Sequence, residues 1–350
     1  MKYGFWLPIF GGWLRNIENE SMPATFDYAK EVAVTAEQLG YDMTLIAELN
    51  LNDIKGIEEP ALDAWSTAAA LAAVTKKLEI LTAIRPGFHN PALTAKAAAN
   101  IDHISGGRFS LNIVSAWWEE EARQYGGIFT SHDERYARTE EFVDVLKGLW
   151  TKTPYNFQGD FYNYKDTYLA PKPISNNHIS LYAGGESEAG KQTIAKTCDS
   201  YVMHGGTVEE IKEKITDMKE RRSALGKEPF QTFGMAAFII CRDTLEEAEA
   251  ELARITNVQE GSSGYAGYKD FVNKSQLNVK LDLKDYSVSN RGLRPNFIGT
   301  PEQIANQILE YEEVGLNLLI LQFSPQLEEM KRFAEQVMPL VEQKKKIGVV

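Results

Sequence analysis

Cysteine is scarce in this sequence, and long apolar runs are absent. The two cysteines, Cys198 and Cys241, are far apart, each lies within an apolar stretch, and neither forms a CxxC pair. This usage is typical of reduced, buried thiols rather than of disulfides or metal ligands. No stretch approaches the roughly 20 apolar residues that cross a bilayer, and the N-terminal MKYGFWLPIF lacks the long apolar region and cleavage site of a secretion signal. The sequence therefore predicts a cytoplasmic protein.

Positively charged residues are also fewer than negatively charged ones. The chain has 37 lysines and arginines against 49 aspartates and glutamates, which gives a formal net charge of −12. A protein of this charge repels nucleic acids and anionic membranes unless its basic residues gather into a patch. The densest basic run is the three lysines at 344–346, which are typical of a solvated helix end. Neither a nucleic acid nor a membrane is predicted as a partner.

Three common functional motifs are missing as well. No GxGxxG follows the first apolar segment, so the usual fingerprint of an open dinucleotide-binding sheet is lacking. No GxSxG indicates a hydrolase, and no spacing of histidines and carboxylates indicates a metal site. These absences disfavour an open nucleotide-binding sheet, a serine hydrolase and a metalloenzyme.

Short apolar segments alternate with longer segments of helical period along all 350 residues. Strands are predicted at residues 3–7, 43–46, 79–82, 109–114, 180–183, 200–203, 232–241 and 318–322. Helices are predicted at residues 26–39, 61–74, 91–104, 138–149, 208–225, 245–255 and 301–314. Eight strands joined by helices predict a single α/β domain, residues 1–350, folded as a closed (β/α)8 TIM barrel.

Two long segments interrupt this alternation. Residues 151–178 are rich in Tyr, Phe, Asn and Pro and are predicted to pack as an ordered excursion. Residues 256–296 contain GSSGYAGY and SNRGLRP, and a loop of this length in a compact domain is either a lid or a mobile insertion. We expect this second segment to be an active-site lid.

The carboxyl ends of the strands carry the functional residues in a barrel of this kind. Residues 183–190, AGGESEAG, follow a predicted strand and open a helix, so their free backbone N–H groups suit a phosphate, although an ordinary strand-to-helix turn has the same glycines. Asn112, in the apolar strand FSLNIV, is expected to point into the barrel. A buried amide there needs hydrogen-bond partners, which either a ligand or the neighbouring backbone can supply.

Two further segments offer polar groups near strand ends. Residues 132–136, HDERY, precede the helix expected from Arg138 and offer a guanidinium and a phenol to a phosphate, although a solvated helix start has the same composition. His89 lies in the loop RPGFHNP, where a neutral imidazole can orient a substrate, although most loop histidines have no chemical role.

The longest informative run is RPGFHNPALTAKAAANIDHISGGRFSLNIVSAWWEEEARQYGG, residues 85–127. It is followed by HDERYARTEEF and, after residues 298–300, by PEQIA. With the final helix, these segments resemble the luciferase-like flavin monooxygenases over nearly the whole chain. IDHISGGR, the pattern N-x-V-[ST]-x-W and the Arg-Tyr pair are similar to the branch that contains dimethyl sulfone, alkanesulfonate and pyrimidine monooxygenases.

The resemblance implies a two-component monooxygenase. Its cofactor is FMN, supplied as FMNH2 by a separate flavin reductase, and O2 is the oxidant that cleaves a carbon–heteroatom bond of a small organosulfur compound. A homodimer or homotetramer is expected. By position, the flavin-binding residues that the resemblance implies are Glu48, Leu49, Asn112, Glu121, Arg135, Tyr136, Gly185, Glu186 and Ser187.

The resemblance also bears on the substrate. Alkanesulfonate monooxygenases carry an arginine and a histidine near the end of one strand, and Ala236 and Phe238 occupy those positions here. Burying a permanent anion without cationic donors is costly, so these residues favour a small neutral substrate such as dimethyl sulfone, unless they only fill the barrel. Loop arginines are the open alternative source of positive charge. The other candidates are Arg85, Trp117 and Arg294 for the substrate, and His89 and Arg291 for catalysis.

Other functions remain open at this point. The chain is compatible with alkanesulfonate or pyrimidine oxidation, with hydride transfer by a dehydrogenase that uses coenzyme F420 on a related barrel, and with flavin binding without turnover. Likeness of fold does not separate these functions. The IDHISGGR and HDERY runs favour the monooxygenase branch.

Overall fold

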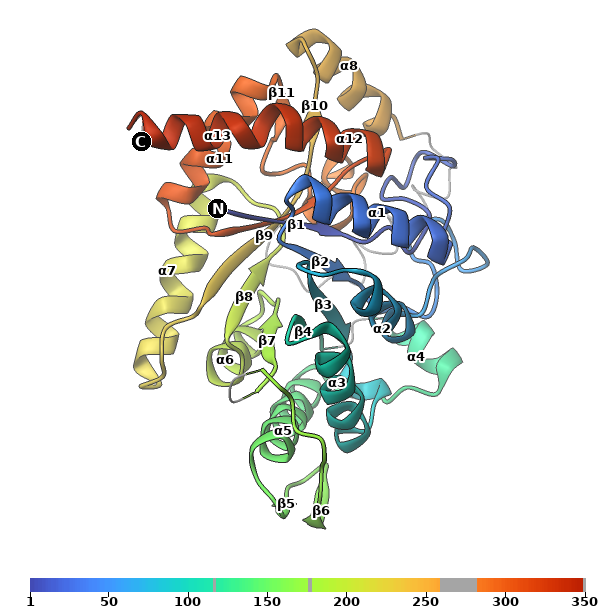
Figure 1. The fold of residues 1–350 in the computed structure, drawn as a ribbon, viewed down its shortest axis with the longest axis vertical. Coiled ribbons are helices and arrows are strands. Elements are labelled where there is room, and N and C mark those ends of the chain that lie inside the picture. Colours follow the sequence, from blue (N-terminus) through green and yellow to red (C-terminus); the bar gives the residue numbers. More distant parts are fainter. Residues whose placement is uncertain (116–117, 176–177, 259–281, 349–350) are drawn as a thin grey trace.

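A closed barrel of eight parallel strands, surrounded by helices, forms the centre of the computed structural model (Figure 1). The structure describes residues 1–115, 118–175, 178–258 and 282–348. The strand order around the barrel is β1-β12-β9-β8-β7-β4-β3-β2, and pairing of β1 with β12 closes it. The barrel strands are β1 (Lys2–Trp6), β2 (Met43–Ile46), β3 (Glu79–Ile84), β4 (Phe109–Ile113), β7 (Ser180–Ala183), β8 (Ser200–Met203), β9 (Thr232–Phe238) and β12 (Leu318–Gln322). The predicted barrel and its eight strands are confirmed.

One predicted strand is too long. The sequence predicts a strand over residues 232–241, but β9 ends at Phe238, and Ile240–Cys241 forms a separate strand, β10, that pairs with β11 (Ile298–Gly299) outside the barrel. The chain leaves the barrel here because the segment before β11 takes over its hydrogen bonds. The Phe238 N–H donates to Gly292 O at 2.8 Å, and the Ile240 N–H donates to Phe297 O at 3.0 Å.

The predicted helices are all present, and several begin at a side-chain cap. The Asn90 side chain accepts from the N–H groups of Ala92 and Leu93, and the Thr300 side chain accepts from Gln303, each just before a proline at the first helical position. The longer helices are α1 (Phe26–Leu39), α2 (Ala64–Val74), α3 (Pro91–Ser105), α5 (His132–Thr151), α6 (Glu188–Thr197), α7 (Val208–Ala224), α8 (Leu245–Thr256), α11 (Pro301–Glu313) and α13 (Met338–Lys346). The shorter elements are η1 (Pro86–Phe88), α4 (Glu119–Tyr125), α10 (Leu283–Tyr286), η2 (Ser289–Arg291), α12 (Gln326–Arg332) and η3 (Phe333–Val337).

Helix α5 begins earlier than the sequence predicts. The expected start was Arg138, with HDERY as a preceding loop, but the helix begins at His132. The Ser131 hydroxyl caps it by accepting from the Glu134 N–H, and Asp133 and Glu134 place negative charge in its first turn. Both features favour a helix start at this point. The HDERY side chains therefore lie on the first turns of a helix.

The structure describes most of the first interrupting segment, but not the central part of the second. Within residues 151–178, β5 (Tyr155–Gln158) and β6 (Asn163–Thr167) form an antiparallel hairpin, which lies beyond α5 at the lower end of Figure 1. Residues 259–281, which contain the central part of the expected lid, lie outside the described residues. The part that follows packs against the loop after β1, where Leu14 and Val288 form an isolated bridge.

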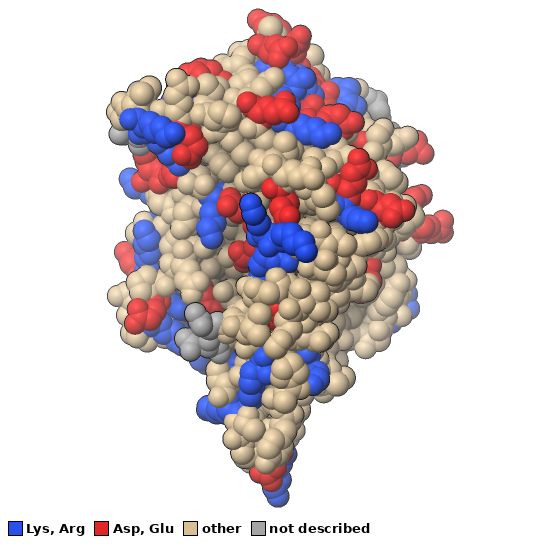
Figure 2. All heavy atoms as spheres, in the orientation of Figure 1, with Lys and Arg blue, Asp and Glu red and all other residues tan. Residues whose placement is uncertain are grey.

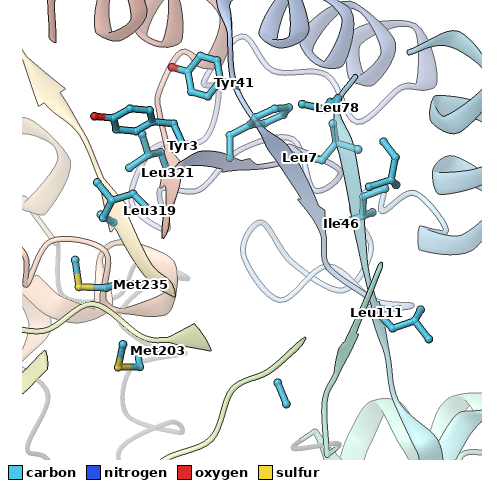
Figure 3. Packing of buried hydrophobic residues seen from close by; sticks show 14 of the residues in the cluster. Tyr3, Leu7, Tyr41, Ile46, Leu78, Leu111, Met203, Met235, Leu319 and Leu321 are labelled. Carbon is cyan, nitrogen blue, oxygen red and sulfur yellow. The ribbon is translucent and has the colours of Figure 1, made fainter. Parts of the chain in front are cut away.

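Side chains alternate between the two faces of the barrel wall. Outward residues such as Tyr3, Met235 and Leu319 pack between strands and helices (Figure 3). A second buried cluster fills the barrel interior with Met43, Leu45, Leu81, Tyr182, Val202, Leu318 and Ile320. The strand register pairs Asn112 with Ala83 on one side and with Tyr182 on the other, so Asn112 belongs to the inward set, as predicted.

Charges of both signs lie side by side on the face shown in Figure 2. No helix in the described parts of the chain is long and apolar enough to cross a membrane.

Candidate active site

The carboxyl ends of the barrel strands bring two clusters of charged residues together. The first, which we call the Arg85 cluster, consists of Arg85, Glu48, Glu121 and His89. Arg85 follows β3 and is 1% exposed. Its guanidinium contacts both oxygens of Glu121, with Nη2 to Oε1 at 3.0 Å, and its Nε lies 3.4 Å from Glu48 Oε2. A buried arginine is thus held by two carboxylates.

Two glycines allow the Arg85 cluster to form. A Cβ on Gly87 would lie 2.5 Å from the Ile128 carbonyl oxygen, and one on Gly127 would lie 2.6 Å from the Phe88 ring. The turn after β3 therefore lies directly against the segment after α4, and the Ile128 N–H donates to Gly87 O at 2.8 Å. This contact brings α4, which carries Glu121, to the end of β3.

Glu48 links His89 to the Arg85 cluster. Glu48 Oε1 lies 2.6 Å from His89 Nε2, and Glu48 Oε2 accepts from the Arg85 backbone N–H at 2.8 Å. A carboxylate paired with arginine only accepts hydrogen bonds, so we assign the His89 proton to Nε2, which leaves Nδ1 as an acceptor when the ring is neutral. The His89 side chain is 29% exposed, and the centres of the His89 and Trp65 rings are 5.9 Å apart. The structure thus gives His89 an oriented, accessible ring.

The flavin contacts expected from Glu48, Leu49 and Glu121 stay predictions. Glu121 is fully buried, and its Oε1 also accepts from the Asn50 N–H, so its oxygens are already bound within the protein. The Glu48 oxygens are bound by Arg85 and His89. Leu49 is half-buried at the edge of the core. The two carboxylates position Arg85 and His89 in the structure as it stands.

The start of α6 is where the sequence analysis expects the phosphate. The Ser187 hydroxyl caps the helix by accepting from the Gly190 N–H at 3.1 Å. The Tyr136 hydroxyl, from the first turns of α5, lies 3.5 Å from Ser187 Oγ. Gly190 permits this approach, because a Cβ there would lie 2.8 Å from the Tyr136 oxygen. A neighbouring cavity lined by residues that include Tyr136, Gly184 and Cys198 does not reach Ser187, and its volume of about 10 Å³ leaves room for one water molecule rather than a phosphate.

Arg135 points elsewhere. Its Nη1 donates to the Thr130 carbonyl, and its guanidinium carbon lies 4.4 Å from the centre of the Phe129 ring. The structure brings Tyr136, rather than Arg135, to Ser187. The predicted role of Arg135 at the phosphate therefore requires a change of rotamer when a ligand binds.

The second charged cluster, which we call the Glu186 cluster, consists of Glu186, Arg291, His204 and Lys214. Arg291 Nη2 lies 2.5 Å from Glu186 Oε2 and 2.7 Å from His204 Nδ1, while Lys214 Nζ lies 2.7 Å from Glu186 Oε1. Burial would raise the pKa of Glu186, but His204 and the charges of Arg291 and Lys214 lower it far below its ordinary value. Glu186 is therefore a carboxylate at neutral pH.

The turn that carries Arg291 has an unusual backbone. Asn290 and Arg291 have φ values of 58° and 54°, in the left-handed region that non-glycine residues rarely adopt. The turn is held by the Gly205 N–H, which donates to Asn290 O at 3.0 Å, and by the Phe238 N–H, which donates to Gly292 O. The strained turn thus lies over the ends of β8 and β9 and fixes Arg291 beside His204.

The remaining substrate candidates are placed differently. Ala236 and Phe238 are 4% and 2% exposed on β9, and Phe238 pairs in register with Gln322 at the end of β12. Arg294 is bound between Glu210 and Asp285, with Nη1 to Asp285 Oδ2 at 3.0 Å. Trp117 lies outside the described residues.

Three buried polar atoms lack a hydrogen-bond partner near the carboxyl ends of the strands. They are Trp6 Nε1, Asn112 Oδ1 and Gln322 Oε1. Buried polar atoms without partners are uncommon and suggest a ligand that satisfies them. An isoalloxazine edge carries both donors and acceptors, and the N-terminus of α6 suits a phosphate, so the described residues fit FMN.

The sequence analysis did not single out Trp6, and it placed Gln322 and His204 at strand ends without assigning them a role. Trp6 and Gln322 are the last residues of β1 and β12, and His204 directly follows β8. The signal that could have identified them is a polar side chain at the end of a predicted strand. No group of three or more His, Cys, Asp or Glu side chains that could hold a metal occurs among the described residues.

Comparison with known proteins agrees with the fold. The chain matches the model of the family described as luciferase-like monooxygenase over residues 1–318. It is 34% identical over 349 residues to the FMNH2-dependent dimethylsulfone monooxygenase of Pseudomonas putida, covering 97% of this chain and 95% of that protein.

Two solved structures of similar fold carry different activities. A long-chain alkane monooxygenase is 19% identical, with a TM-score of 0.82 over 99% of this chain and 92% of that one. An F420-dependent secondary alcohol dehydrogenase is 21% identical, with a TM-score of 0.74 over 97% of this chain and 98% of that one. At these identities the structural likeness supports the fold alone.

Proposed function

This chain belongs to the luciferase-like monooxygenase family, and we propose that it uses reduced FMN and O2 to oxidise a small neutral organosulfur compound such as dimethyl sulfone. The similarity to the FMNH2-dependent dimethylsulfone monooxygenase of Pseudomonas putida supports both the proposed cofactor and the proposed substrate. We further propose that a separate flavin reductase supplies the reduced FMN, that the subunits form a homodimer or homotetramer, and that the protein works in the cytoplasm.

The observation that carries the substrate proposal is the pairing of the candidate arginines. Arg85 is bound by two carboxylates, and so is Arg294. Arg291 is bound by Glu186. A sulfonate is a permanent anion, and moving it out of water without a free cation is costly, whereas a sulfone brings only hydrogen-bond acceptors. The charge balance of these three arginines favours the neutral sulfone.

Bound FMN supplies the activation of O2, and the residues of this chain hold it and shape the space around it. Ser187, Tyr136 and the free N–H groups of α6 would hold the phosphate. Asn112 and Gln322 would satisfy the ring edge through their unpartnered oxygens. His89 Nε2 holds its proton against Glu48, and the buried apolar side chains of Ala236 and Phe238 on β9 would keep water from a substrate beside them.

Replacing Ser187 by alanine is expected to weaken FMNH2 binding. Losing one charge-assisted phosphate hydrogen bond removes roughly 1.5–3 kcal/mol, which is about tenfold to a hundredfold in affinity. Tyr136→Phe should weaken binding in the same direction, and Arg135→Ala measures whether that guanidinium turns to the phosphate in the complex. Anaerobic titration followed by flavin fluorescence measures the affinities.

The matched control for Ser187→Ala is Thr207→Ala at the cap of α7. Thr207 caps its helix in the same way, through the Glu210 N–H. Both substitutions remove a helix cap, which destabilises a helix by about 1 kcal/mol, but only Ser187 lies at the proposed phosphate site. Equal FMNH2 affinities in the two variants would refute the assignment of the phosphate to α6.

The proposed activity is tested by supplying the purified protein with a flavin reductase, NADH and FMN. We expect sulfinate release from dimethyl sulfone at a higher kcat/KM than sulfite release from methanesulfonate. The reverse order would overturn the neutral-substrate proposal. Tighter binding of reduced coenzyme F420 than of FMNH2 would instead indicate a hydride-transfer enzyme.

A further inference from the structure

We propose that Glu186 is the residue that sets the charge preference for substrates, because it neutralises Arg291 and so prevents anions from binding there. This inference rests on the proposed function and deepens it. Glu186 acts through Arg291 and is therefore a positioning residue. When its charge is removed, the same pocket should accept small sulfonates.

Arg291 lies on the turn that packs against the carboxyl ends of β8, β9 and β12, where the proposed function places the substrate. Arg291 is 5% exposed, and its Nη2 bridges Glu186 and His204. The next residue, Gly292, packs against the carboxyl ends of β9 and β12, since a Cβ there would lie 3.0 Å from Phe238 Cβ and 3.1 Å from Gln322 Oε1. Arg291 therefore belongs to the turn that packs against Phe238 and Gln322.

Glu186 is the only carboxylate that contacts Arg291 within the described residues. His204 accepts from Arg291 through Nδ1, so its proton is on Nε2 and the ring brings no positive charge of its own. Lys214 shares the same carboxylate through Oε1. Removing the Glu186 charge would therefore leave one buried guanidinium and one nearby ammonium without a counter-ion.

A purely structural role for the Glu186–Arg291 pair makes a different prediction. If the pair only held the turn at residues 289–292 in place, its loss would reduce turnover of every substrate alike. A change in selectivity toward anions requires the guanidinium to remain and its neutralising charge to go. The isosteric change Glu186→Gln does this, because the amide oxygen can still accept from Arg291 or Lys214.

The test compares Glu186→Gln with the double variant Glu186→Gln/Arg291→Gln. Methanesulfonate is measured as a competitive inhibitor of dimethyl sulfone oxidation, and its Ki is divided by the KM for dimethyl sulfone. We expect this ratio to fall about tenfold or more in Glu186→Gln, which corresponds to about 1.4 kcal/mol of selectivity, and to return to the parent value in the double variant. An unchanged ratio in Glu186→Gln, or the same fall in both variants, would overturn the proposal.

Glu188→Gln is the control for charge alone. Glu188 lies two residues along the same helix start, but its side chain is 73% exposed and pairs with Lys191 and Arg221. We expect the parent ratio in this variant. A fall as large as that of Glu186→Gln would mean that overall charge, and not the pairing of Arg291, sets the preference, and would count against the proposal.

One more measurement is needed, because the proposed phosphate site lies next to Glu186. Ser187 follows Glu186 directly, so loss of the carboxylate could instead strengthen binding of the FMN phosphate. Direct binding of methanesulfonate is therefore measured by calorimetry with FMN already saturating. Glu186→Gln should bind methanesulfonate and the parent should not, whether or not either protein turns over dimethyl sulfone. A parent that fails to oxidise dimethyl sulfone would refute the proposed function, whereas a Glu186→Gln variant without methanesulfonate binding would refute this inference.

Discussion

Replacing Arg85 by alanine is expected to lower the free energy of unfolding by about 3–5 kcal/mol, because it leaves buried carboxylates without a counter-ion. Glu121 is fully buried, and both of its oxygens bind Arg85. The Glu48 side chain is 8% exposed and also contacts Arg85. Removing one partner of a buried ion pair costs more than the pair itself contributes, since the remaining charge cannot be solvated. Chemical denaturation followed by circular dichroism measures the loss.

Two companion variants separate this mechanism from a general effect of losing an arginine. Arg123 lies on the same helix as Glu121 and pairs with Glu120, but its side chain is 70% exposed, so Arg123→Ala should leave the denaturation midpoint close to that of the parent. The double variant Arg85→Met/Glu121→Gln removes the arginine and the more deeply buried of its two carboxylates, while Glu48 keeps its contact with His89, so it should recover part of the stability lost in Arg85→Ala. A double variant that is less stable than Arg85→Ala would contradict the explanation by an unpaired charge.

The barrel could be predicted because short apolar strands alternate with segments of helical period along the chain. Alternation along FSLNIV also placed Asn112 correctly on the inward side, since the side-chain period of a strand is two. The end of β9 could not be predicted in this way. Residues 240–241 continue the apolar run, and only their pairing with residues 297–299, far away in the sequence, shows that they leave the barrel.

The start of α5 was missed for a local reason. A cap at Ser131 and two acidic residues after it are a readable helix start, but the polar HDERY run also suits a loop. The error matters at the site. Residues 135 and 136 are separated by about 100° on a helix, so Tyr136 reaches Ser187 while Arg135 turns to Phe129.

The contacts of the arginines at the site could not be predicted from the sequence. Arg85 and Glu121 are 36 residues apart, and Arg291 and His204 are 87 apart, so no local spacing links them. The sequence analysis therefore treated each arginine as a free cation that could bind a sulfonate. Their carboxylate partners, which only the fold brings near, change that conclusion and strengthen the case for a neutral substrate.

Adding one methyl group at Gly205 is expected to disrupt the turn that carries Arg291. A Cβ at Gly205 would lie 2.1 Å from the Arg291 carbonyl oxygen and 2.8 Å from Pro295 Cδ. The nearest of these is a backbone atom, so the overlap can be relieved only by moving the turn itself. Overpacking of this kind costs about 1–3 kcal/mol of stability, and a shift of about 1 Å in a positioned group can cost about a hundredfold in rate. We expect Gly205→Ala to lose about a hundredfold in kcat/KM for dimethyl sulfone.

The adjacent Gly206 gives the matched control for this prediction. A Cβ at Gly206 would lie 2.9 Å from Glu210 Oε2, a side-chain atom that accepts from the Thr207 N–H, so Gly206→Ala should disturb the start of α7 rather than the backbone of the turn and should cost much less kcat/KM than Gly205→Ala. Hydrogen exchange of residues 289–296 gives a readout that does not depend on the substrate. Exchange there should accelerate in Gly205→Ala, because the hydrogen bond from the Gly205 N–H to Asn290 O is lost when the turn moves, and should remain slow in Gly206→Ala. Equal exchange and equal kcat/KM in the two variants would show that the close approach of Gly205 does not hold Arg291 in place.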